Sequence, residues 1–225
     1  MKFLTVLLCV LYAGALGAQT PDVQKPGAAE AHIEAPSGSS DSPAQAAASA
    51  GDVRARETAA RFAAVDTIHS RFVQEKRMAL LTEPVVSEGV FSFQKNPARI
   101  RWEYTKPFQN GFVIDGEYTF RLEKGVKKAV KGVMARNIAA QMLVWLAFDL
   151  PTLSKTYSVT FFDGGAVLKP LSDKNRMLEQ ITVWFAPDNP QALSKIEMAE
   201  PGGDSTTLLF LDTETNRPLP QDAFK

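Results

Sequence analysis

The fold is decided by the stretch FSFQKNPARIRWEY, residues 91–104. Apolar and polar side chains alternate within it: Phe91 and Phe93 flank a serine, and Ile100 and Trp102 each stand between charged residues. A period of two is typical of a strand whose two faces have different surroundings. One face is aromatic and the other charged, so we expect an antiparallel sheet with one face toward water.

The same alternation recurs along most of the chain after residue 68. The apolar positions of these later runs are Tyr118, Phe120, Leu122, Tyr157, Val159, Phe161, Ile181, Val183, Phe185, Ile196 and Met198. Asp115-Gly116 and Lys124-Gly125 separate runs and are typical of hairpin turns. The spacing predicts about eleven strands. Eight strands already enclose enough room to fill with side chains, so a closed or nearly closed sheet of eleven leaves space for something else.

Two segments have helical patterns. Residues 53–68 place Ala55, Phe62 and other apolar residues at helical spacing after Asp52, a candidate N-cap. Residues 134–148 have almost no polar face, which is typical of a helix that is buried. Fifteen residues are too few to cross a bilayer, so we expect this second helix against the curved sheet, ending before Pro151.

Composition excludes several classes of function. Lys plus Arg equals Asp plus Glu at 25 each, so nucleic acid is not an expected partner. Two histidines and one cysteine leave no expected metal site or cofactor. His69 is the only histidine in the predicted domain, without a Gly-x-Ser-x-Gly motif, so we predict that the protein is not an enzyme. The basic run from Lys124 to Arg136 fits an exposed edge strand, or alternatively a surface for an acidic partner or anionic headgroups.

The N-terminal part has the pattern of an exported protein. Residues 1–18 combine Lys2, a short apolar stretch and a run of small residues, which predicts a secretory signal peptide; an uncleaved anchor is the alternative. Residues 19–51 are rich in Ala, Pro and Ser, which predicts a disordered linker. The folded domain is expected over residues 52–225.

The aromatic face has two interpretations. Its side chains and the apolar helix together form a packed core, which is the usual role of such patterns. Alternatively, sheet and helix leave a gap that takes apolar guests, which the strand count and the aromatic and Met content favour. Periodicity alone leaves both open.

Several elements resemble the LolA family of periplasmic outer-membrane lipoprotein carriers. They are Ile68-His69-Ser70-Arg71-Phe72-Val73-Gln74, Gly89-Val90-Phe91-Ser92-Phe93, Asn96-Pro97-Ala98-Arg99-Ile100-Arg101-Trp102-Glu103-Tyr104, Pro107, Val113-Ile114-Asp115-Gly116, Asn216-Arg217-Pro218-Leu219 and Phe224. The resemblance covers about residues 53–224 and implies an incomplete antiparallel barrel of about eleven strands, mainly β with helices, in which a helical lid covers an apolar cavity for acyl chains.

The resemblance also implies site residues. The lipid-binding positions would be Phe91, Phe93, Ile100, Trp102, Tyr104, Ile114 and Phe120 from the sheet, with Met134, Ile138, Met142 and Trp145 from the lid. Family members often place an arginine directly before the proline as a lid latch. Here that position is Asn96, and Arg99 or Lys95 is the candidate substitute.

The implied function is a periplasmic, monomeric carrier that delivers lipoproteins from the inner to the outer membrane. Its partners would be acylated lipoproteins, an inner-membrane releasing ABC transporter of the LolCDE type and an outer-membrane acceptor. The alternative is an envelope-stress sensor or regulator that uses the same lipid-binding barrel and contacts a membrane-anchored protein.

Overall fold

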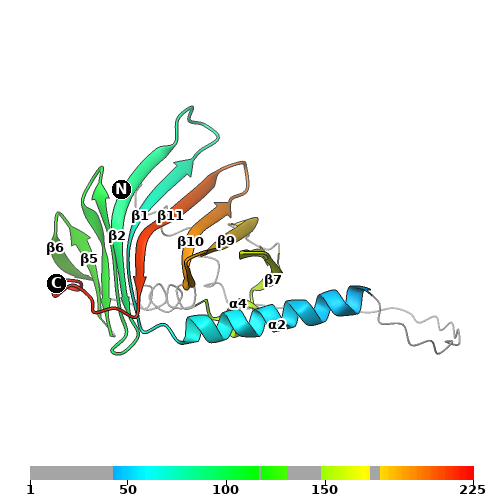
Figure 1. Cartoon of the computed structure of the whole chain (residues 1–225). Helices are drawn as coiled ribbons and strands as arrows, with labels where there is room; N and C mark the ends of the chain where they lie inside the picture. The colour runs from blue at the N-terminus through cyan, green and yellow to red at the C-terminus, as the bar shows by residue number, and fades with distance from the viewer. Residues whose placement is uncertain (1–42, 117, 131–147, 173–177) are drawn as a thin grey trace, which may run out of the picture.

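The computed structural model describes residues 43–116, 118–130, 148–172 and 178–225. Eleven strands and two helices lie within these ranges (Figure 1). In chain order they are α2 (Pro43–Ala63), β1 (Thr67–Arg77), β2 (Val85–Gln94), β3 (Arg99–Lys106), β4 (Asn110–Asp115), β5 (Tyr118–Glu123), β6 (Val126–Val130), α4 (Leu150–Leu153), β7 (Tyr157–Phe162), β8 (Gly165–Pro170), β9 (Gln180–Ala186), β10 (Asn189–Ala199) and β11 (Ser205–Thr215).

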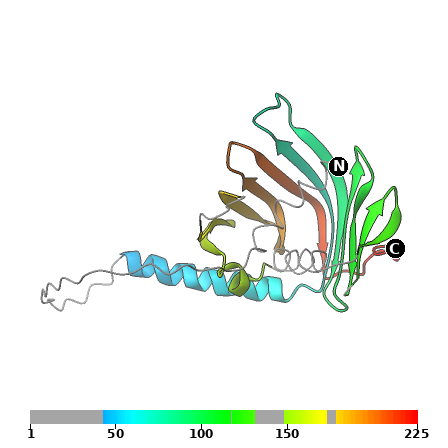
Figure 2. The ribbon, with the colours of Figure 1, turned by 180° about the vertical axis from the view of Figure 1, so that it is seen from behind.

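All eleven strands form one sheet in the order β6-β5-β4-β3-β2-β1-β11-β10-β9-β8-β7. Every neighbouring pair is antiparallel, and the sheet is open because β6 and β7 are its two edges. The sheet curves around the C-terminal end of α2, as both views show (Figures 1 and 2). The predicted fold class, a mainly β protein with an antiparallel sheet of about eleven strands, is therefore confirmed.

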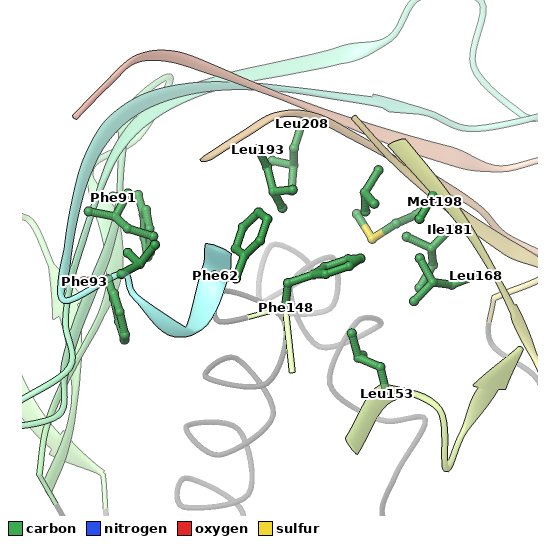
Figure 3. Packing of buried hydrophobic residues seen from close by; sticks show 14 of the residues in the cluster. Phe62, Phe91, Phe93, Phe148, Leu153, Leu168, Ile181, Leu193, Met198 and Leu208 are labelled. Atoms are coloured by element: carbon green, nitrogen blue, oxygen red, sulfur yellow. The ribbon is translucent and has the colours of Figure 1, made fainter. Parts of the chain in front are cut away.

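Strand register assigns each side chain to one of two faces, because directly paired residues point the same way. We call the face toward α2 the inner face and the opposite one the outer face. Phe93 pairs with Ile68 and Ile100, and Phe91 pairs with Ser70 and Trp102. These side chains lie on the inner face, which Phe62 of α2 approaches (Figure 3).

The first helix differs from its predicted limits. It begins at Pro43, so Asp52 lies inside α2 and does not cap it. Alanine is the strongest helix former, and proline suits a first turn, which explains why the Ala-rich end of the expected linker is helical. Ile68, expected at the end of this helix, lies in β1, where it is paired with Phe93 of β2 and Thr215 of β11. The predicted signal peptide lies outside the described residues.

A side-chain donor closes the C-terminal end of α2. Lys95, in the turn between β2 and β3, donates from Nζ to the carbonyl oxygen of Ala63 over 2.6 Å. The last carbonyls of a helix have no intrahelical partner, and a cation there also complements the helix dipole. Lys95 thus fixes α2 to the sheet at the point where the chain enters β1.

The main core lies between the inner face and three short segments from outside the sheet. Phe62 lies near the end of α2, Val65 follows α2, Phe148 precedes α4, and Leu150 and Leu153 belong to α4. Figure 3 shows Phe62 and Phe148 inside the curve of the sheet. Asp149 caps α4, and Pro151, expected to end the preceding helix, lies in the first turn of α4.

A smaller buried region lies on the outer face. Val113 and Leu122 are 0% exposed, and register places both on this face. The C-terminal segment reaches the same face: Lys127 donates to the carbonyl oxygen of Phe224, and Arg99 lies 5.7 Å from the centre of the Phe224 ring. The outer face is therefore partly covered by the chain's own end.

Candidate functional site

The inner face of β1 to β4 carries a continuous aromatic and aliphatic surface, which we call the aromatic face. Its members are Phe72, Phe91, Phe93, Ile100, Trp102, Tyr104, Phe112 and Ile114. The alternation of each strand places them on one side, and the antiparallel register aligns them across four strands. Ile100 is 0% exposed and Phe91 is 1% exposed, so the part of the aromatic face around these two residues is packed against neighbouring groups.

Trp102 is the centre of the aromatic face. Its ring centroid lies 4.4 Å from that of Phe72, 5.5 Å from that of Phe91 and 6.4 Å from that of Phe210. Gly89 makes the first contact possible: a Cβ at residue 89 would lie 2.3 Å from Cζ of Phe72. Edge and tilted ring contacts of this kind add to the free energy of burial.

The aromatic face becomes polar toward the C-terminal end of β1. The Tyr104 hydroxyl donates to Oε1 of Gln74 over 2.8 Å, and Ser87, paired with Gln74, is also buried. Burial raises the pKa of Tyr104 to about 12, and the neighbouring indole of Trp102 lowers it by a smaller amount. Tyr104 is therefore neutral at every physiological pH.

A buried ion pair lies beyond this polar band. Lys76 of β1 pairs with Glu200, and Thr206 donates to the same carboxylate over 3.3 Å. Lys76 is 6% exposed. A charge this deeply placed needs a partner, and Glu200 supplies it. The inner face of β1 thus runs from apolar at Ile68 to charged at Lys76.

The other half of the sheet also contributes to the inner face, which the sequence prediction of site residues did not include. These side chains are Tyr157, Val159, Phe161, Ala166, Leu168, Ile181, Val183, Phe185, Ile196, Met198 and Leu208. Phe62, Phe148 and Phe185 form a group of three rings with centroids 5.4 to 5.7 Å apart. The alternation in β7, β9 and β10 was the signal that would have identified most of this half.

The structure places the predicted sheet residues unevenly. Phe91, Phe93, Ile100, Trp102, Tyr104 and Ile114 share the inner face, as expected. Phe120 does not: it pairs with Val113, so it points to the outer face, where Lys127 lies 5.3 Å from its ring centre. Its assignment to the lipid-binding surface is therefore wrong. Met134, Ile138, Met142 and Trp145 lie outside the described residues.

The predicted latch residues lie away from the inner face. Arg99 is on the outer face, where its Nε donates to Oδ1 of Asp115 over 2.7 Å. Asn96 is exposed in the turn between β2 and β3. A latch role for Arg99 toward a lid over the inner face is inconsistent with this orientation. Lys95, the other candidate, holds α2.

Two lysines of the basic run, Lys127 and Lys128, make contacts within the chain, and the part of the run after residue 130 lies outside the described residues. β6 is an edge strand, as one of the two interpretations of the run predicted. Lys128 pairs with Glu123, and this ion pair is the main reason that the pKa of Glu123 is lowered. Lys127 contacts Phe120 and the C-terminal segment. These contacts favour the edge-strand interpretation over a docking surface.

A pocket of about 470 Å³ lies on the outer face, under the C-terminal segment. Its lining residues are Thr67, Gln94, Arg99, Asp115, Arg217, Pro218, Leu219, Pro220, Gln221, Ala223, Phe224 and Lys225. This pocket has both polar and apolar lining residues and is separate from the aromatic face. The predicted apolar cavity on the inner face stays a prediction.

Two features of the described residues concern other classes of protein. Neither α2 nor α4 combines the length and apolar character that crossing a membrane requires. Within the same residues, no group of three or more His, Cys, Asp or Glu side chains is arranged to hold a metal ion.

The open antiparallel sheet of eleven strands agrees with the fold that the resemblance to the LolA family implied. Residues 63–225 match the model of the family described as outer membrane lipoprotein carrier protein LolA. The chain belongs to this family.

Curated relatives and solved structures show more distant similarity. The outer-membrane lipoprotein carrier protein of Pseudoalteromonas translucida is 27% identical over 138 residues, which are 61% of this chain and 65% of that protein. The protein of the same description from Albidiferax ferrireducens is 29% identical over 149 residues, or 62% of this chain and 68% of that protein. The chain thus spans about 65% of the length of the first of these relatives.

Among solved structures, the Mycobacterium tuberculosis lipoprotein LppX aligns with a TM-score of 0.47 and 13% identity, over 76% of this chain and 98% of that one. The Pseudomonas aeruginosa MucA/MucB complex aligns with a TM-score of 0.48 and 13% identity, over 76% and 59% of the respective chains.

Proposed function

We propose that this protein is a periplasmic carrier that shields the acyl chains of lipoproteins against its inner face. Family membership supports the class of function, and the aromatic face is the observation that carries it to particular residues. Six of the seven sheet residues expected to touch lipid share that face. The relatives described above are lipoprotein carriers, and this chain's cargo is proposed to be of the same kind.

The physical basis is the cost of exposing hydrocarbon to water. Each acyl methylene removed from water contributes about 0.8 kcal/mol, so partial shelter of a few chains is enough to keep a lipidated protein in solution. Side chains of the aromatic face offer apolar contact without charge. Binding must also be reversible, so cargo must compete with contacts that the empty protein makes with itself.

Delivery follows from the same proposal. The carrier would accept cargo from an inner-membrane ABC transporter of the LolCDE type and release it to an outer-membrane acceptor, as a monomer and without catalysis or a cofactor. Transfer runs toward the acceptor if the acceptor binds acyl chains more strongly than the inner face does. The predicted lid, which lies outside the described residues, would regulate access.

The test is displacement of an apolar dye from the purified protein by a triacylated lipopeptide. Phe112→Asp places a charge on a half-buried position of the inner face, and we expect it to weaken lipopeptide binding at least tenfold. Leu211→Asp, on the outer face of β11 and 37% exposed, is the matched control and should leave binding unchanged. Equal affinities of both variants and the wild type would refute the proposal.

Transfer is measured separately. Wild-type protein loaded with a lipoprotein should pass it to outer-membrane vesicles, leaving unloaded carrier in solution. A stable complex with a membrane-anchored regulator, together with no transfer, would instead identify the protein as an envelope-stress sensor.

A further inference from the structure

Trp102 has an unpaired hydrogen-bond donor. The residue is 3% exposed, and its Nε1 has no hydrogen-bond partner in the described part of the chain. Tyr104 is a neighbour, with ring centroids 6.5 Å apart, and its hydroxyl donates to Gln74; the indole N–H is close enough to lower the pKa of that hydroxyl slightly but does not meet the geometry of a hydrogen bond. Buried polar groups are nearly always paired, so an unpaired one calls for a functional explanation.

The surroundings of this donor limit what would satisfy it. An indole N–H only donates, so its partner must be an acceptor. Phe72, Phe91 and Phe210 surround the indole with aromatic rings and carry no charge. Among the described residues of this part of the inner face, the cation Lys76 is already paired with Glu200, so a carboxylate there would be buried without a free cation. A neutral carbonyl oxygen is the acceptor that fits, because burying an unpaired ion costs far more.

Trp102 also lies at a change of polarity along the aromatic face. On one side of it in register are Ile100, Phe93 and Ile114, all buried and apolar. On the other side are Tyr104 and its partner Gln74. A ligand with a hydrocarbon end, a neutral carbonyl and a polar end matches this order.

We propose that the Trp102 N–H binds the carbonyl oxygen of the ester or amide that attaches an acyl chain to its lipoprotein. The hydrocarbon then lies toward Ile100 and Ile114, and the glyceryl or peptide part lies toward Tyr104 and Gln74. This inference rests on the proposed function and deepens it, because it gives the acyl chain a direction and a depth. The same hydrogen bond favours esters and amides over ether-linked chains and over free fatty acids.

The test compares two lipids that differ only in the carbonyl groups. Dioctanoylglycerol has ester carbonyls, and 1,2-dioctylglycerol is its ether-linked counterpart. In dye displacement with the full chain, the wild type should bind the ester about three- to tenfold more tightly, the range of one net hydrogen bond. Trp102→Phe should lose this preference and bind the ether with an affinity within about twofold of the wild type.

Trp184→Phe is the matched control. Trp184 lies on the outer face of β9, where Lys195 is 3.7 Å from its ring centre, and its replacement should keep the ester preference. Octanoate should bind more weakly than the ester. Equal binding of ester and ether by the wild type, or an unchanged preference in Trp102→Phe, would overturn the inference.

Two further outcomes separate the inference from the proposal beneath it. Binding of neither glycerolipid to the wild type, with no displacement by a triacylated lipopeptide, would refute the carrier function and the subsite together. Should Trp102→Phe not fold, the indole N–H proton of Trp102 in the wild type is followed by NMR. It should shift downfield with the ester and much less with the ether; equal shifts would refute the subsite.

Discussion

Replacing Phe62 with alanine tests whether α2 is held to the sheet by an aromatic core. Phe62 is 2% exposed and lies next to the last residue of α2. Its ring centroid is 5.4 Å from that of Phe148 and 5.7 Å from that of Phe185. Helix α2 contacts β7 and β10, so the loss of this ring weakens its attachment to that half of the sheet.

The magnitude follows from burial and ring contacts. Burying a phenylalanine side chain contributes about 1.5–3 kcal/mol, and each of the two ring pairs adds about 0.5–1.5 kcal/mol. Together with the cavity left behind, Phe62→Ala should lower the free energy of unfolding by about 4 kcal/mol, within the range typical of buried phenylalanines. For a urea dependence of about 2 kcal/mol per molar, the midpoint falls by about 2 M.

The assay is urea unfolding of the full chain, followed by circular dichroism. Val53→Ala is the matched control, because Val53 lies on the same helix and is 52% exposed. It should change the free energy of unfolding by less than about 0.5 kcal/mol. If Phe62→Ala behaves like Val53→Ala, the ring cluster does not stabilise the domain and our description of the core is wrong.

Three other predictions concern single contacts. Gly89→Ala should lower the melting temperature by more than 5 °C, equivalent to about 2 kcal/mol, because the new Cβ would lie 2.3 Å from Phe72 Cζ; an unchanged melting temperature would contradict this packing. Burial raises the pKa of Tyr104 from its ordinary value of 10.0 to about 12, so its contribution to the free energy of unfolding is complete below pH 10 and is lost between pH 10 and about 12. Between pH 10 and about 12, the free energy of unfolding of the wild type, measured by urea titration, should therefore fall by up to about 2–3 kcal/mol more than that of Tyr104→Phe. Parallel pH profiles of the two proteins would refute this prediction. Lys95→Met removes the hydrogen bond to Ala63 and should cost about 1 kcal/mol, with faster hydrogen exchange in the last turn of α2; unchanged exchange would show that this contact is not formed in solution.

The strands were predictable because each carries its own period of two. Phe91, Phe93, Ile100 and Trp102 share a face as the alternation indicated. Phe120 shows where the pattern was insufficient, since alternation within a strand does not fix its phase relative to the next strand. That phase depends on the turn: Asp115 pairs with Tyr118, which pairs Phe120 with Val113. The Asp-Gly signal located the hairpin, but the loop lies between Asp115 and Tyr118 and does not include Asp115.

Other features depended on contacts far apart in the chain. An apolar outer-face residue such as Leu122 is buried on a face that carries charge elsewhere, and the C-terminal segment reaches that face through Phe224. No local pattern reports such coverage. Arg99 was a candidate latch only as a substitute for the arginine that family members place before the proline, but strand register directs it to Asp115. The start of α2 was misjudged because a low content of large apolar residues was given more weight than the helix propensity of alanine.

The junction of β1 and β11 has a consequence for folding kinetics. All other strand pairs join strands that are consecutive in the chain. The two meanders, β1 to β6 and β7 to β11, can therefore each form by adding one hairpin at a time. The junction alone is remote: Asp66 donates from its backbone N–H to Asn216, 150 residues later. Closing so long a loop has an entropic cost that is recovered only when both meanders are formed. We therefore expect the hairpins to form rapidly and the pairing of β1 with β11 to limit the rate at which the domain folds.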